Sequence, residues 1–148
     1  MKPGKQTHVR YLIITMLFIA SCFSYGDRVA LSIAGVAMEK QLSLDPVKLG
    51  FLLSGFSWAY VLGQLPSGGL LDRFGSKRTY LCSILLWSGF TLLQGTVGLL
   101  TGAAAVGALV VLRMLVGAAE APAFPANSRI TSAWFPNHER GLAAAIFN

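Results

Sequence analysis

The sequence predicts an all-α membrane protein with about four transmembrane helices and the start of a fifth. Of its 148 residues, 54% are hydrophobic and only 12% are charged, whereas a soluble domain would carry about a quarter charged residues. Long uncharged stretches alternate with short charged segments, which is typical of membrane crossings. The expected helices lie at about residues 11–38, 47–71, 79–99 and 103–129, with a fifth opening at residue 141.

Each expected helix has its own boundary signals. The first is longer than the roughly 20 residues that a crossing needs, which allows a tilt or a kink near Gly26. Pro46 suits the first turn of the second helix, and the charged residues 72–78 form a tight turn before the third. Pro122 and Pro125 interrupt the fourth helix. The fifth has not crossed when the sequence ends, so we expect the front part of a larger protein.

The net charge of +6 is confined to one side of the expected membrane. The tail at residues 1–10 carries three positive charges, the turn at 72–78 has an excess of two, and the segment after the fourth helix has an excess of one. We expect a multi-pass inner-membrane protein, and by the positive-inside rule its tail should lie in the cytoplasm. This placement makes the lipid bilayer, and not a nucleic acid, the expected partner.

No enzyme chemistry is expected from the sequence. His8 and His138 lie alone near the expected cytoplasmic face, and no metal-ligand cluster or nucleophile–base spacing occurs. We therefore expect neither a metal nor another cofactor.

The second helix carries small residues at a strict four-residue spacing, namely Gly55, Ala59, Gly63 and Ser67. The fourth helix offers a shorter version with Gly117 and Ala121. Such stripes allow two helices to approach closely in lipid, so we expect a packing seam here.

A polar stripe runs along one face of the first helix, at Ser21, Tyr25, Arg28 and Ser32. Polar side chains inside a membrane face protein or water. Asp27 is turned by about 100° from Arg28, so we expect these two charges to have different partners.

The fourth helix repeats this pattern, because Arg113 and Glu120 are two turns apart on one face. Burial disfavours an ionised carboxyl and a nearby arginine favours it, so Asp27 or Glu120 could exchange a proton. Arg28 or Arg113 could bind a carboxylate through two parallel hydrogen bonds. The alternative is that the four charges form static ion pairs that hold the helices together.

Tyr60 and Gln64 share a face of the second helix. They could hydrogen-bond a polar ligand, or bond between helices; the sequence leaves both open.

Residues 68–78, GGLLDRFGSKR, resemble the signature loop between the second and third helices of the major facilitator superfamily. Gly68 would allow close helix approach and Gly75 the turn. The resemblance implies that residues 11–148 form part of an N-terminal six-helix domain of a twelve-helix major facilitator fold. It also implies that Asp72 and Arg73, with the two glycines, form a conformational gate. The family often has Arg where Ser76 stands.

Several further segments resemble the anion:cation symporter branch of that superfamily and its sugar-acid carriers: residues 25–28, Arg113 with 120–122, 124–125, 134–136 and 139–141. That likeness implies that Asp27 and Glu120 are the protonatable pair, that Arg28 contacts the substrate carboxylate, and that Tyr25 and Tyr60 help to bind it. Ser24 stands where close relatives often have Asn.

The implied function is proton-coupled uptake of a sugar-acid anion such as D-glucarate, galactarate or D-galactonate. The partners would be that small carboxylate, protons, the bilayer and the remainder of the transporter chain. One alternative is a four-helix, proton-coupled exporter of cations, against which the two arginines argue. Another is a truncated or scaffolding membrane fragment that transports nothing.

Overall fold

A computed structural model describes residues 9–41 and 45–147, and all of its regular elements are helices. The predicted all-α class is therefore confirmed. Residues 1–8, which make up most of the predicted tail, and residues 42–44 lie outside the described residues, as does residue 148.

Within residues 9–41 and 45–147, five α-helices and one short 3-10 helix follow one another. They are α1 (Val9–Gln41), α2 (Pro46–Thr96), η1 (Val97–Leu99), α3 (Gly102–Glu120), α4 (Ala123–Trp134) and α5 (Arg140–Phe147). Three segments of the described chain are long and apolar enough to cross a membrane, namely Val9–Gly35, Pro46–Leu99 and Gly102–Trp134. The second of these has 54 residues, which is enough for two crossings of about 20 residues each.

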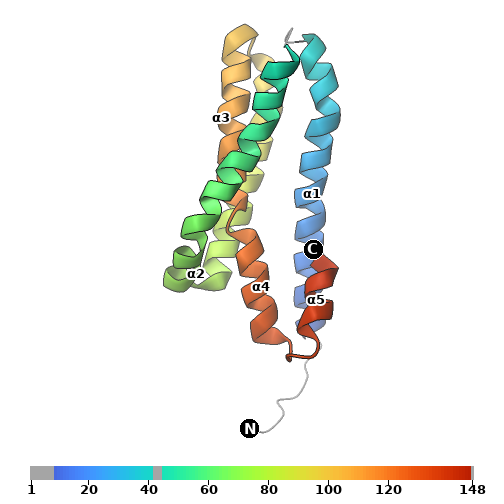
Figure 1. Cartoon of the computed structure of the whole chain (residues 1–148), viewed down its shortest axis with the longest axis vertical. Helices are drawn as coiled ribbons and strands as arrows, with labels where there is room; N and C mark the ends of the chain where they lie inside the picture. Colours follow the sequence, from blue (N-terminus) through green and yellow to red (C-terminus); the bar gives the residue numbers. More distant parts are fainter. Residues whose placement is uncertain (1–8, 42–44, 148) are drawn as a thin grey trace.

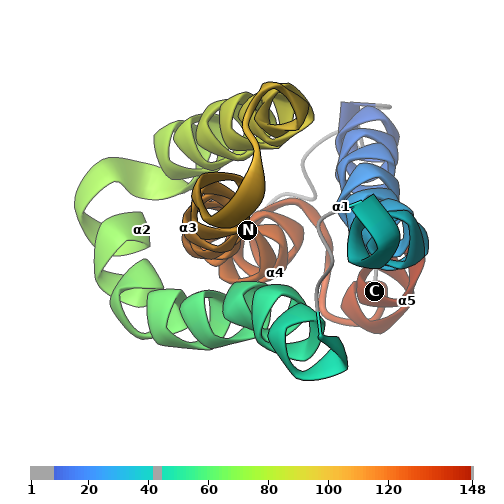
Figure 2. The same ribbon diagram turned by 90° about the horizontal axis from the view of Figure 1, so that it is seen from above.

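A bend at Gly75 divides α2 into two arms, residues 46–74 and 76–96, which we call the first and second arm. Gly75 has φ 77° and ψ 158°, a backbone conformation outside the helix that side chains disfavour. The Thr79 hydroxyl donates to the carbonyl of Leu70 across the bend, at 3.3 Å. The chain reverses direction here (Figure 1), and Figure 2 shows the two arms on either side of α3.

The break between α3 and α4 lies at Pro122. Proline lacks the N–H that would continue the helical hydrogen bonds, and α3 ends at Glu120 while α4 begins at Ala123. Pro125 does not break α4, because it lies in the first turn, where its missing N–H costs nothing.

The predicted small-residue seam joins the first arm of α2 to α3. A Cβ added to Gly117 would lie 2.4 Å from the backbone oxygen of Phe56, and one added to Gly63 would lie 2.8 Å from the Cβ of Ala121. Glycine at these two positions is therefore what allows the helices to touch, and the predicted close packing is confirmed there. Gly68 differs, because a Cβ at Gly68 would meet no atom within 4 Å. No other described helix therefore lies close to Gly68, and its expected part in a close helix approach stays a prediction for the full-length protein.

The start of α1, the bend at Gly75 and the α4–α5 connection lie at the same end of the molecule (Figure 1). There the Arg10 guanidinium donates to the Glu139 carboxylate at 2.9 Å. Beside this pair, Ile14, Phe135 and Ala143 form a small apolar cluster. These contacts join α1 to α5 and to the connection before it.

Candidate functional site

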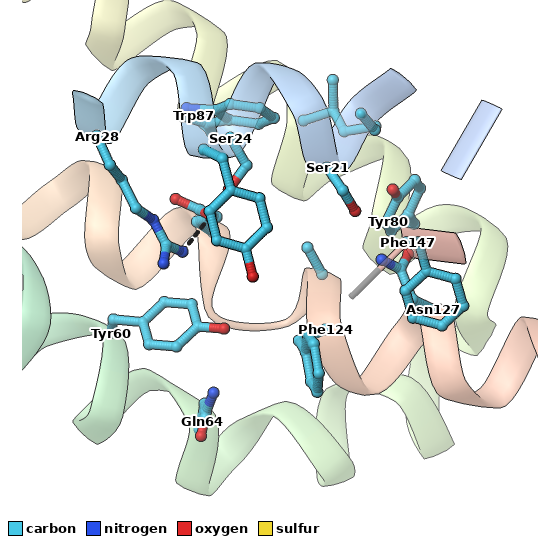
Figure 3. Close-up of a pocket in the computed structure, with 15 residues that line it drawn as sticks. Ser21, Ser24, Arg28, Tyr60, Gln64, Tyr80, Trp87, Phe124, Asn127 and Phe147 are labelled. Carbon is cyan, nitrogen blue, oxygen red and sulfur yellow. Dashed lines mark hydrogen bonds and ion pairs between the residues drawn. The ribbon is translucent and has the colours of Figure 1, made fainter. Parts of the chain in front are cut away.

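A cavity of about 170 Å³ lies between α1, both arms of α2, the end of α3, α4 and α5. We call it the central cavity. Figure 3 shows side chains from these helices pointing into it. Its polar lining residues are Ser21, Ser24, Tyr25, Arg28, Tyr60, Gln64, Tyr80, Glu120 and Asn127.

An ion pair between Arg28 and Glu120 forms one wall of the central cavity. Nη2 of Arg28 lies 2.6 Å from Oε1 of Glu120, and the Ser24 hydroxyl donates to the same oxygen. The Glu120 side chain is only 6% exposed and that of Arg28 is 36% exposed. Glu120 is the last residue of α3, where the helix dipole disfavours a negative charge. The two donors from α1 therefore compensate a carboxylate that both burial and the helix end destabilise.

Aromatic rings surround the Arg28 guanidinium. Its central carbon lies 5.4 Å from the Tyr25 ring centre, 4.8 Å from Phe56 and 5.3 Å from Tyr60. Phe56 and Tyr60 are themselves stacked, with centres 5.7 Å apart. Arginine lies favourably over such ring faces. The guanidinium is thus held in place while part of it remains open to the cavity.

Asp27 has different partners from Arg28, as the helical geometry predicted. Its Oδ2 accepts a hydrogen bond from Nε1 of Trp87 at 2.9 Å and one from the Thr91 hydroxyl at 3.4 Å. Asp27 lines a second, more apolar cavity of about 700 Å³ between α1 and the second arm of α2. We call this the outer cavity.

Arg113 is buried inside the bundle without lining either of these two cavities. Its guanidinium carbon lies 5.4 Å from the Phe56 ring centre, so both arginines face the same ring. Arg113 interacts electrostatically with Asp27 and Glu120, while its Nε has no hydrogen-bond partner within the described chain.

The structure thus brings five of the predicted binding and coupling residues to one cavity: Tyr25, Arg28, Tyr60, Gln64 and Glu120. Asp27 and Arg113 lie outside it. The four charges do not form one cluster, because only Arg28 and Glu120 are in direct contact.

The residues predicted to form a gate lie apart from the central cavity, around the bend of α2. Asp72 pairs with Arg129 of α4 at 2.7 Å. The Arg73 guanidinium lies 5.5 Å from the Phe74 ring centre, and Gly75 forms the bend itself.

Sequence reasoning missed Phe56 and Trp87. Both are apolar residues in long apolar helices, so nothing distinguished them from ordinary core residues. One available signal was that Trp87 and Thr91 are four residues apart, which places two hydrogen-bond donors on one helix face. The Asp72–Arg129 pair was also missed, because its members are 57 positions apart.

Comparison with known families decides what kind of protein this is. A family model described as the Major Facilitator Superfamily matches residues 17–148. The chain belongs to this superfamily. Its members carry several membrane helices, so this is a multi-pass membrane protein of a transporter family, and the expectation that it is not an enzyme is confirmed.

Individual superfamily members match almost the whole chain. A protein of Escherichia coli (strain K12) named "Probable galactarate/D-glucarate transporter" is 60% identical over 144 residues, which cover 97% of this chain and 32% of that protein. A protein of the same name from Bacillus subtilis (strain 168) is 52% identical, covering 98% and 32%. The "D-galactonate transporter" of Escherichia coli O6:H1 is 40% identical, covering 99% and 32%. The chain thus spans about a third of the length of these relatives.

Proposed function

We propose that a full-length protein carrying this sequence takes up a sugar-acid anion together with protons across the bacterial inner membrane. The observation that carries this proposal is the Arg28–Glu120 pair on the wall of the central cavity. The names of the relatives favour galactarate, D-glucarate or D-galactonate as the anion. Because the chain belongs to the Major Facilitator Superfamily, we do not propose the alternative of a four-helix exporter of cations.

Arg28 is the proposed anchor for a substrate carboxylate. Its guanidinium is permanently charged and planar, so it can form two parallel bonds to a carboxylate. In the structure, Nη2 of Arg28 already donates a hydrogen bond to the Glu120 carboxylate. Tyr25, Tyr60 and Gln64 line the same cavity and offer hydrogen bonds to the hydroxyl groups of the substrate.

Competition for Arg28 would couple the proton to the substrate. An ionised Glu120 holds the guanidinium, whereas a protonated Glu120 holds it more weakly because its charge is gone. Protonation from outside would therefore free Arg28 for the anion, and loss of the proton toward the cytoplasm would help to expel it. Asp27 is the proposed second proton site, and Arg113 lies within electrostatic range of both acids.

The gate is proposed to lie at the bend of α2, apart from the central cavity. The Asp72–Arg129 pair joins the bend to α4, and breaking it would let the bend move relative to α4. We place Asp72, Arg73, Gly68 and Gly75 in this gate. Exchanging the charges, Asp72→Arg with Arg129→Asp, should restore transport that either single change reduces; no restoration would show that the pair has no such role.

The proposed function is tested by uptake of labelled galactarate, glucarate and galactonate into vesicles that contain the full-length protein. Uptake should depend on an inward proton gradient. Asp27→Asn and Glu120→Gln should each abolish the gradient-driven accumulation, while Glu39→Gln, near the end of α1 and outside both cavities, should not. Full accumulation by either of the first two variants would refute its assignment as a proton site. No uptake of any of the three acids by folded protein would refute the proposed function.

A further inference from the structure

Trp87, together with Ala20 and Ile84, lies between the two cavities. Its side chain lines the central cavity and also the outer cavity, and the residue is only 7% exposed. The indole Nε1 donates to the Asp27 carboxylate at 2.9 Å on the outer side. The indole ring (Figure 3) also lines the central cavity, together with Arg28 and Glu120. No sequence motif assigned a function to this residue.

Trp87 also belongs to the apolar cluster that supports the Arg28 site. This cluster consists of Phe56, Trp87, Val116 and Ala119, with Tyr60 packed against it. Phe56 and Tyr60 are two of the rings over which the Arg28 guanidinium lies, and Val116 and Ala119 precede Glu120 on α3. A shift of the indole ring would therefore displace the side chains that position Arg28 and Glu120, because closely packed interiors transmit displacement.

The bond between Trp87 and Asp27 depends on the charge of the acid. A hydrogen bond to an ionised carboxylate is roughly twice as strong as one to a neutral group. The groups near this carboxylate are Thr91 on the second arm of α2, which donates more weakly at 3.4 Å, and Arg113 on α3, which acts through its charge. The outer cavity has no lining residue from α4 or α5. Trp87 is thus the one side chain lining both cavities that bonds directly to Asp27 among the described residues.

We propose that Trp87 is a positioning residue that transmits the charge state of Asp27 to the wall of the central cavity. An ionised Asp27 holds the indole edge and fixes the ring against the Phe56 cluster. A neutral Asp27 releases that edge, so that the ring and the rings around Arg28 can rearrange when the substrate enters. This proposal rests on the proposed function, because it assumes that Asp27 exchanges a proton during transport.

Trp87→Phe tests this proposal, because phenylalanine keeps an aromatic ring in the cluster and removes the N–H donor. The full-length protein is reconstituted into proteoliposomes and assayed in two ways with labelled galactarate. One assay measures accumulation driven by an inward proton gradient. The other measures exchange of internal for external galactarate at equal pH. During exchange the transporter returns across the membrane with substrate bound, so its proton sites do not have to return empty.

Trp87→Phe should lower gradient-driven accumulation by about tenfold or more, since a charge-assisted bond is lost, while exchange should be retained. In an Asp27→Asn background the same substitution should have no further effect on exchange. Trp58→Phe is the matched control, because Trp58 lies on α2 and is 67% exposed. It should leave both assays within about twofold of the parent.

The two proposals fail in different ways. Absence of galactarate exchange by the unsubstituted protein would overturn the proposed function. If that protein exchanges and accumulates normally, equal losses in both assays for Trp87→Phe would show a merely structural role and overturn the inference. Unchanged accumulation would overturn it as well. Should Trp87→Phe fail to fold, Trp87→Leu also lacks the donor and is assayed in its place.

Discussion

The guanidinium groups of Arg28 and Arg113 both lie over the ring of Phe56. The guanidinium carbons of Arg28 and Arg113 are 4.8 and 5.4 Å from its ring centre. Two cations that would otherwise repel each other are thus both oriented by one ring, which attracts each of them through its electron-rich face. The ring therefore contributes to the position of the proposed carboxylate anchor as well as to core packing.

Phe56→Leu should weaken binding of the sugar acid. Leucine keeps most of the apolar volume but has no ring face, and a contact of this kind contributes about 0.5–2 kcal/mol. The Kd for galactarate, measured by calorimetry on the full-length protein, should rise by about two- to thirtyfold.

Phe90→Leu is the control for this change. Phe90 packs against the same apolar cluster, and no cation lies over it among the described residues. Equal changes of Kd in both variants would show that packing alone, and not the contact with arginine, explains the effect of Phe56.

At the scale of elements, the crossing of α3 with the first arm of α2 depends on glycine. Gly117→Ala would place a methyl group 2.4 Å from the Phe56 carbonyl oxygen, so the helices would have to move apart. Overpacking of this kind costs typically about 1–3 kcal/mol, and we expect a lower unfolding temperature for the full-length protein in detergent. Gly107→Ala on the same helix meets nothing within 4 Å and should not lower it. Equal stability of the two variants would contradict the geometry of this crossing.

The bend of α2 gives a second prediction at this scale. The φ of 77° and ψ of 158° at Gly75 lie in a region that is essentially restricted to glycine, where another residue costs about 1–3 kcal/mol. Gly75→Ala should therefore destabilise the protein, as measured by its unfolding temperature.

Gly68→Ala is the matched comparison, because Gly68 has open space around its Cα in this structure. We expect its unfolding temperature to equal that of the parent. If Gly68→Ala nevertheless abolishes transport, Gly68 makes its close contact in another conformation of the transport cycle or with a part of the full-length protein that this chain does not span. If Gly75→Ala is as stable as the parent, the bend does not require glycine.

For the molecule as a whole, the fold was largely predictable and the pairing of side chains was not. Uncharged stretches predicted the helices, and residue spacing predicted which side chains share a face, such as Tyr25 with Arg28. Spacing within one helix cannot say which residue on another helix is the partner. The contact of Arg28 with Glu120 spans 92 positions, and Trp87 becomes a polar partner only because the second arm packs beside Asp27. The same limit applies to Gly68, because spacing does not tell which helix would lie opposite it.

The orientation of the whole molecule is testable by chemical labelling. The charge distribution predicts that the end with the α4–α5 connection is cytoplasmic. In a full-length protein with Cys22 and Cys82 replaced by Ala, Gly98→Cys in η1 should react with a membrane-impermeant maleimide added to intact cells. His138→Cys, in the α4–α5 connection, should react only after the membrane is permeabilised. The reverse pattern would mean that the N-terminus is external.

The ion pair between α1 and α3 has a consequence for how the protein is made. The ribosome completes α1, with Asp27 and Arg28 near its middle, long before it reaches Glu120, 92 residues beyond Arg28. An unpaired acid or arginine at the centre of a transmembrane helix costs about 2.5–3.5 kcal/mol each on insertion. The first helix should therefore remain beside the insertion machinery, or be held by a chaperone, until the segment that carries its partner has been synthesised.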